Sequence, residues 1–198
     1  MRARDKAKGL SIRWVEADAC TFHLERQFHL IFEAGTFQHF LNRSDQEAVL
    51  ARVHEHLAPE GCFALSVGFT RPKLMTNTEM HDWFSYVNEN GQEVRVSGTY
   101  EYDPVRQISI ETAYRCWRDT EGQERVRRTP LALRHFFPQE MEALLHYNGF
   151  VVMERYGNWD LSPLSSESGV MIYVCRKARR VRYIGGLSPP NPRMQPTA

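Results

Sequence analysis

The stretch FHLIFEAGTFQHFLNRSDQEAVLARVHEHLAPEGCFALSVGF, residues 28–69, holds two short apolar runs on either side of an amphipathic segment. The runs Phe28–Phe32 and Cys62–Phe69 have the length and continuity of strands in the core of a sheet. The segment between them repeats apolar side chains at helical spacing: Val49, Leu50, Val53 and Leu57. Strand, helix and strand in this order predict a βαβ unit with two parallel, neighbouring strands.

The residues around the amphipathic segment predict where its helix begins and ends. Ser44 can cap the start, and Glu47 completes an S-x-x-E capping box three residues later. Pro59-Glu60-Gly61 stops the helix before the second apolar run. The apolar strand at 28–32 is followed directly by Glu-Ala-Gly-Thr-Phe-Gln-His, residues 33–39. Packing of a core strand does not require this mixture of small and polar residues at its end.

Regular patterns also precede and follow this unit. Residues 10–18 alternate as a strand does, and residues 93–136 form three alternating segments separated by turn signals. The three segments predict an antiparallel meander. Residues 138–150 then carry a helix pattern that ends at Gly149, and two more strand-like runs follow, at 150–157 and 169–177.

Composition limits the kind of protein and its partners. A chain of 198 residues with 42% hydrophobic content is enough for one domain with one core. Lys+Arg 25 against Asp+Glu 24 gives no overall charge that would favour nucleic acid or an anionic membrane, so neither is expected as a partner. No apolar run approaches the roughly 18 residues of a membrane span, and no signal peptide is seen.

The cysteines and histidines suggest no metal site. The four cysteines are far apart, without a C-x-x-C pair, so we expect reduced, mostly buried thiols and a cytoplasmic location. His54 and His56 are two positions apart on the predicted helix and point to different sides of it, so both are expected to be solvated.

Taken in order, these segments resemble the class I S-adenosylmethionine-dependent methyltransferases, over about residues 6–177. GLSIRWVEADACTFHL, residues 9–24, is similar to the third strand and its exit. Residues 28–67 are similar to strand four, the next helix and strand five, with Ala58-Pro59-Glu60-Gly61 in place of the usual Pro-Gly-Gly turn. Residues 136–160 resemble the last helix and strand six. The resemblance implies an α/β fold: a Rossmann-like methyltransferase sheet with a three-stranded antiparallel β insertion at about residues 80–136.

The resemblance also implies S-adenosyl-L-methionine as the cofactor. It identifies residues for one half of the binding site. Asp18 and Ala19 form the acid–small pair that faces the adenine in this family. The exit of the strand at 28–32 supplies the other expected contacts: Glu33, Ala34, Gly35 and Phe37. Ligands of open parallel sheets bind beyond the carboxyl ends of the strands, which favours the same positions on physical grounds. The alternative is that Asp18 only caps a turn and that Phe22 and Phe37 belong to the core.

One signature of the family is missing from the sequence. The glycine-rich turn E/D-x-G-x-G-x-G, where backbone amides approach the amino-acid part of the cofactor, does not occur, nor does the acid that ends the second strand. We therefore expect an N-terminally truncated domain whose sheet lacks the first strand-helix-strand unit. Because the family's strand order is 3-2-1-4-5-7-6, residues 10–16 should then be poorly anchored or pair directly with residues 28–32.

The expected reaction is methyl transfer to a small-molecule acceptor, which depends mainly on alignment in a dry pocket. His39 is the candidate base where the acceptor must lose a proton, although a helix-flanking structural role is an equal alternative. Acceptor-side candidates lie in the insertion and after strand six: Trp83, Tyr86, Arg134 and Trp159. Aromatic residues on alternating strands are more often core.

The domain organisation expected from these patterns is a partial methyltransferase domain at residues 1–177 and a disordered, proline-rich tail at 178–198. Two other interpretations stay open. One is a non-catalytic methyltransferase fold that is a remnant or binds a partner. The other is a ligand-binding β protein built on residues 93–136, against which the βαβ pattern argues. The sequence leaves the oligomeric state undecided.

Overall fold

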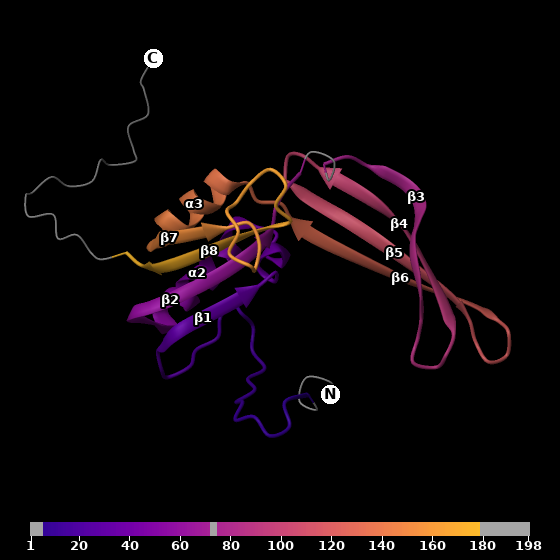
Figure 1. The fold of residues 1–198 in the computed structure, drawn as a ribbon, viewed down its shortest axis with the longest axis horizontal. Helices are drawn as coiled ribbons and strands as arrows, with labels where there is room; N and C mark the ends of the chain where they lie inside the picture. The colour runs from indigo at the N-terminus through magenta and orange to yellow at the C-terminus, as the bar shows by residue number, and fades with distance from the viewer. Residues whose placement is uncertain (1–5, 72–74, 179–198) are drawn as a thin grey trace, which may run out of the picture.

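The computed structural model describes residues 6–71 and 75–178, and most of the predicted tail therefore lies outside the described residues. The described chain forms two four-stranded sheets. One belongs to an α/β layer, and the other extends away from that layer as a long, twisted blade (Figure 1). The α/β fold expected from the sequence is confirmed.

The sheet of the α/β layer, sheet A, has the order β1-β2-β8-β7. Its strands are β1 (Phe28–Ala34), β2 (Leu57–Gly68), β7 (Phe150–Tyr156) and β8 (Val170–Lys177). β1 and β2 are parallel, whereas β8 is antiparallel to both β2 and β7. β1, β2 and β7 therefore run in one direction, and their carboxyl ends meet at one edge of the sheet. In the family's numbering this order corresponds to 4-5-7-6.

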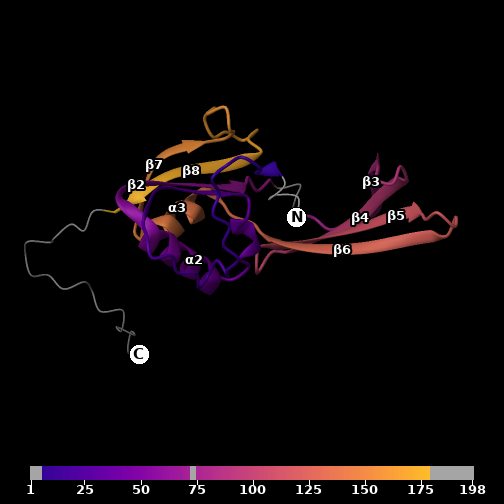
Figure 2. The same ribbon diagram turned by 90° about the horizontal axis from the view of Figure 1, so that it is seen from below.

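Helices cover one face of sheet A (Figure 2). They are α2 (Arg43–His56) and α3 (Pro138–Tyr147), and the short 3-10 helix η1 (Phe37–His39) precedes α2. Their apolar sides and the alternate residues of the strands make the core, whose fully buried members include Leu50, Leu57, Phe63, Leu65, Met141, Leu145, Phe150 and Tyr173. On the opposite face of β1, Leu30 and Phe32 are 63% and 57% exposed.

The start of α2 differs from the expected one. Asn42, not Ser44, is the cap: it has an extended backbone, and its Oδ1 accepts a hydrogen bond of 2.9 Å from the Asp45 N–H. Ser44 lies inside the first turn and donates to the same oxygen at 2.6 Å. Glu47 pairs with Arg43 at 2.6 Å instead of completing a capping box. Asn, Asp and Ser are similarly good caps, so residue type alone could not choose between Asn42 and Ser44.

β2 begins directly after α2, without a separate turn. The pairing with β1 is irregular there, passing from Phe28 opposite Leu57 to Leu30 opposite Cys62. The four residues Ala58 to Gly61 fill this irregularity. A Cβ on Gly61 would lie 3.0 Å from the carbonyl oxygen of Phe28, so the close approach of the two strands requires a glycine.

The second sheet, sheet B, consists of β3 (Thr78–Val87), β4 (Glu93–Asp103), β5 (Ile108–Arg118) and β6 (Glu124–Arg134) in consecutive antiparallel order. β4, β5 and β6 are the three strands expected of the insertion. β3 is a fourth, formed by residues expected to connect strand five to the meander. Two register shifts, between Thr78 and His81 and between Asp82 and Phe84, interrupt its alternation, so no clear strand pattern was visible in the sequence.

The predicted strand at residues 10–16 is wrong. These residues have no regular secondary structure, and Leu10, Ile12 and Trp14 are between 46% and 66% exposed. Of the two alternatives expected for residues 10–16, the poorly anchored segment is the one observed. These residues do not pair with β1. Within the described chain β1 is an edge strand, and a strand needs a neighbour to satisfy its backbone groups.

Candidate functional site

The carboxyl edge of sheet A gathers the exits of β1, β2 and β7. Gln38, just after β1, links two of them: its Oε1 accepts from the Gly68 N–H at 2.8 Å and its Nε2 donates to the Arg134 carbonyl at 3.3 Å. The Gly35 N–H donates to the Ser66 carbonyl at 3.2 Å. The edge is therefore fixed by hydrogen bonds between chain segments that are far apart in the sequence.

Glu33 organises the exit of β1. Its Oε1 accepts from the backbone N–H groups of Thr36 and Phe37, the second at 2.9 Å, and so holds the start of η1. Its Oε2 is buried and has no hydrogen-bond partner among the described residues. Burial raises the pKa of Glu33, and the hydrogen bonds from the backbone act against that shift. The backbone of Ser66 is one of the hydrogen-bonding groups that act on this carboxylate, so Glu33 also ties the exit of β1 to β2.

Next to Glu33 the edge is open. Gly35 has φ +76, and a Cβ built on it would meet no atom within 4 Å. Ala34 is exposed. The small side chains therefore leave the backbone accessible from outside, and the left-handed φ explains why residue 35 is a glycine.

Asp18 and Ala19 lie in a tight turn near the first turn of α2. Asp18 Oδ1 accepts from the Cys20 N–H at 2.7 Å, and its carbonyl accepts from the N–H groups of Thr21 and Phe22. The Cys20 thiol donates to the Asp45 carbonyl at 3.8 Å and fastens the turn to α2. Asp18 thus fills the turn-capping role that the sequence left open, with one carboxylate oxygen engaged.

Phe37 and Phe22 are not at the edge. Phe37 is fully buried in the core, with its ring 5.8 Å from Phe40 and 5.5 Å from Phe136. Phe22 packs on the His56 ring at 4.8 Å. The expectation that Phe37 contacts the cofactor is therefore corrected: its ring is enclosed in the core and anchors η1 there.

His39 and Trp159 are at the same edge and accessible. His39 is the last residue of η1, is exposed, and donates its backbone N–H to Thr36. Trp159, in the loop after β7, is 51% exposed and lies 5.5 Å from the Phe32 ring, centroid to centroid. Of the residues predicted for catalysis or acceptor binding, these two have exposed side chains at the same edge of sheet A as residues 33–35.

The other acceptor-side candidates have different positions. Trp83 packs over Gly98 on β4 and beside the buried Val94 and Val96. Tyr86 lies opposite Val94, near the far end of sheet B. The Arg134 guanidinium donates at 2.6 Å to Gln107 and also pairs with Glu140 in the first turn of α3. Trp83 and Arg134 thus have structural partners, and Tyr86 is remote from the edge of sheet A.

A buried polar network next to the edge was not predicted. His135 is 6% exposed, and its Nε2 lies 2.8 Å from the Ser109 hydroxyl and 3.1 Å from the Tyr100 hydroxyl. Its Nδ1 lies 3.4 Å from Thr70, whose hydroxyl donates to the Phe136 carbonyl. Burial and the nearby Arg134 lower the pKa of His135. The network joins the end of sheet B nearest sheet A to the residues that follow β2. No residue spacing in the sequence predicts these contacts.

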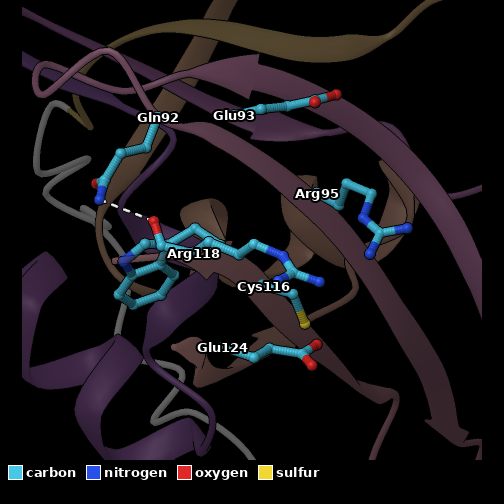
Figure 3. A pocket seen from close by; sticks show the side chains of 7 residues that line it. Gln92, Glu93, Arg95, Cys116, Arg118 and Glu124 are labelled. Atoms are coloured by element: carbon cyan, nitrogen blue, oxygen red, sulfur yellow. Dashed lines mark hydrogen bonds between the residues drawn. The ribbon is translucent and has the colours of Figure 1, made fainter. Parts of the chain in front are cut away.

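A cavity of about 560 Å³ lies at the far end of sheet B. Figure 3 shows the side chains that line it, with the Gln92 amide donating to the Arg118 carbonyl at 2.9 Å. Its charged residues are Glu93, Arg95, Arg118 and Glu124. None of the predicted site residues lines this cavity, so it is separate from the candidate site.

All four cysteines are free, and Cys175 is buried, where desolvation raises its pKa to about 12. None of the helices in the described ranges has the length and apolar character needed to cross a membrane.

Comparison with known proteins agrees with this architecture. Residues 1–61 match the family model described as a methyltransferase domain. An S-adenosylmethionine-dependent methyltransferase from Clostridium acetobutylicum ATCC 824 is 15% identical, with a TM-score of 0.73 over 90% of this chain and 70% of that one. The CcbJ methyltransferase from Streptomyces caelestis is 20% identical, with a TM-score of 0.68 over 89% and 69% of the two chains.

The sugar N-methyltransferase KedS8 from Streptoalloteichus sp ATCC 53650 is 18% identical, with a TM-score of 0.67 over 89% of this chain and 67% of that one. No curated protein matches the chain. The resemblance drawn from the sequence is thus confirmed: the chain has the fold of the S-adenosylmethionine-dependent methyltransferases, and its first 61 residues match the sequence model of a methyltransferase domain.

Proposed function

We propose that this chain takes part in methyl transfer from S-adenosyl-L-methionine to a small-molecule acceptor. One observation carries the proposal: the exits of three strands that run in one direction meet at one edge, where Glu33 and Gly35 end β1 and Trp159 follows β7 and packs near the Phe32 ring. This is where ligands of open α/β sheets bind. The open space at Gly35 and the exposed Ala34 beside it leave room for a ligand against the backbone there.

The residues proposed to hold the cofactor are Asp18, Ala19, Glu33, Ala34 and Gly35. When bound, the cofactor supplies a methyl group already activated by its positively charged sulfur. The free carboxylate oxygen of Asp18 would accept a hydrogen bond from the adenine amino group, and the backbone around Gly35 would lie against the ligand. The sequence supplies no glycine-rich turn for the amino-acid part of the cofactor.

On the acceptor side, Trp159 would provide an apolar face and His39 would take a proton from the acceptor. KedS8, one of the similar structures, is a sugar N-methyltransferase. We therefore propose an amine of a small polar molecule as the acceptor. An amine attacks through a free lone pair, so a base at the edge is useful wherever the amine arrives protonated. Trp83 and Arg134 are engaged in the fold and are not available to the acceptor.

A second candidate function is that of a non-catalytic, partner-binding module. The observation in its favour is the edge position of β1 together with the exposed Leu30 and Phe32 on the face without helices. Unpaired strand edges and exposed apolar patches are typical of interaction surfaces.

Calorimetric titration with S-adenosylhomocysteine separates the two candidates. Methyl transfer predicts saturable one-to-one binding by the 198-residue chain. Replacing the small Ala34 with a large side chain, Ala34→Trp, should fill the open edge and weaken binding at least about tenfold, or about 1.4 kcal/mol. Val126→Trp, on the exposed side of β6, is the matched control and should bind as the unchanged chain does.

Equal affinity of the Ala34→Trp variant and the unchanged chain would place the ligand elsewhere and contradict the proposed edge. An absence of saturable heat up to millimolar ligand would exclude cofactor binding by this chain and favour the partner-binding candidate.

A further inference from the structure

The last turn of α2 meets the N-terminal segment at a small cluster of imidazole and carboxylate groups. His23 lies in the segment before β1, and Glu55 and His56 are the final two residues of α2. A cavity of about 300 Å³ is lined by these three residues together with residues 24–27. One ligand atom from each of the three side chains lies within 4.8 Å of the other two.

His56 is held in the orientation and tautomer of a metal ligand. It is 2% exposed, in contrast to the solvated position expected from the sequence. Its Nδ1 lies 2.7 Å from the Arg52 carbonyl, and because a carbonyl only accepts, Nδ1 must carry the proton. The Nε2 lone pair therefore points toward the cluster, where it accepts from the Leu24 N–H at 2.8 Å. Metal-binding histidines typically have their other nitrogen bonded to a backbone carbonyl in this way.

His23 and Glu55 complete the set from the solvent side. His23 Nδ1 lies 2.9 Å from Glu55 Oε1, and the two side chains are 61% and 38% exposed. Arg52 pairs with the other carboxylate oxygen, Oε2, at 2.7 Å, so Oε1 is the atom that faces the histidines. The cluster also lies at the carboxyl end of α2, where the helix dipole favours a cation.

From this arrangement we propose that His23, Glu55 and His56 bind a divalent transition metal ion, of which Zn²⁺ is the best match. Two imidazoles and one carboxylate form a ligand set that zinc uses, with water in the fourth position. The ion would replace the proton shared by His23 and Glu55 and would take the Nε2 lone pair of His56 from the Leu24 N–H. Tetrahedral zinc ligands lie about 3.3 Å apart, and the three ligand atoms already lie within 4.8 Å of one another, so small side-chain shifts would bring them to that spacing.

The consequence of such a site is a stabilised N-terminal segment. Cys20 is bonded to Asp45 in the first turn of α2, and Phe22 packs on His56 in the last. The segment that carries Asp18 and Ala19 therefore runs along α2, and a metal ion at His23 would fasten its second end. The inference does not depend on methyl transfer, because it concerns only the attachment of this segment.

Zn²⁺ titration of the metal-free chain by calorimetry tests the site, with Co²⁺ absorption as the readout of geometry. We expect one-to-one binding, the visible absorption of tetrahedral Co²⁺, and a melting temperature raised by several degrees at saturating Zn²⁺. His23→Ala and Glu55→Gln should each weaken Zn²⁺ binding at least about tenfold. Both positions are exposed, so the variants should fold, whereas the buried His56 is left unchanged.

His29→Ala is the matched control, since His29 is an exposed histidine on the neighbouring strand β1. It should bind Zn²⁺ like the unchanged chain. The proposal is overturned by the absence of saturable binding, or by His23→Ala and His29→Ala variants that bind Zn²⁺ equally well.

Discussion

Gly98 and Trp83 are complementary residues on neighbouring strands of sheet B. A Cβ on Gly98 would lie 2.4 Å from the Trp83 ring and 2.5 Å from the Thr112 carbonyl oxygen. The indole thus occupies the space that a side chain at residue 98 would need. This explains why an aromatic residue predicted for the acceptor pocket is instead part of the packing of the sheet.

Gly98→Ala should destabilise the protein by about 1–3 kcal/mol, since neither the large ring nor the backbone of β5 can move aside without cost. The measurement is the free energy of unfolding from chemical denaturation. Gly169→Ala is the matched control: Gly169 is exposed and a Cβ there would meet no atom within 4 Å. A Gly98→Ala variant as stable as Gly169→Ala would contradict the close packing of Trp83 on β4.

Residue types in the sequence identified the exit of β1 but not the roles of its individual side chains. Glu33 and Gly35 were recognised because acidic and small residues after an apolar run are unusual. Gln38 and His56 have roles that depend on partners 30 or more positions away, such as the 96-residue separation between Gln38 and Arg134. Such contacts leave no periodic signal in one sequence.

The elements with strong periodicity were predicted, and those that depend on a neighbour were not. α2, α3 and the strands β4 to β6 follow from alternation and helix-ending residues. β3 was missed because its register shifts break the alternation. Residues 10–16 were predicted as a strand from alternation alone, which fails because a strand also needs hydrogen-bonding partners.

His135 connects four elements and should make their association sensitive to pH. Its ring bonds to side chains from β4, β5 and the exit of β2, while its backbone follows β6. Burial lowers its pKa in the folded protein, so the unfolded chain, with a pKa near 6.5, binds the proton more readily. The stability that the neutral, buried His135 contributes is therefore fully present above about pH 6.5. It is lost as the pH falls from there toward the folded-state pKa of His135.

We therefore expect the free energy of unfolding to fall more steeply between pH 7.5 and 5.5 in the unchanged chain than in His135→Gln, by up to about 1 kcal/mol. Denaturant titration at each pH measures the two slopes, so a uniform loss of stability in the variant does not affect the comparison. His29→Gln, at an exposed position, should keep the original slope. Identical slopes for the unchanged chain and His135→Gln would contradict a buried, neutral His135.

Within the described ranges, helices cover only one face of sheet A. Leu30, Phe32, Met153 and Trp159 are each more than half exposed. The alternation in β1 turns Leu30 and Phe32 away from the face that α2 and α3 cover, and β1 also exposes one row of its backbone hydrogen-bonding groups. The exposure of this face depends on which elements cover the sheet, and no local pattern in the sequence indicates that.

An apolar sheet face beside an open strand edge should make the chain associate with itself. Sedimentation velocity should show concentration-dependent association at about 10–100 μM, which corresponds to roughly 5.5–7 kcal/mol per contact. The double substitution Leu30→Lys and Phe32→Lys should return the chain to a monomer, because charged side chains on an edge strand oppose pairing. Lysines at Val126 and Ile110, exposed positions of sheet B, are the matched control and should leave the association unchanged.

A chain that is monomeric throughout this concentration range would show that the open face is too small, or too interrupted by polar groups, to drive association. An equal effect of the sheet B lysines would assign the association to net charge rather than to this face.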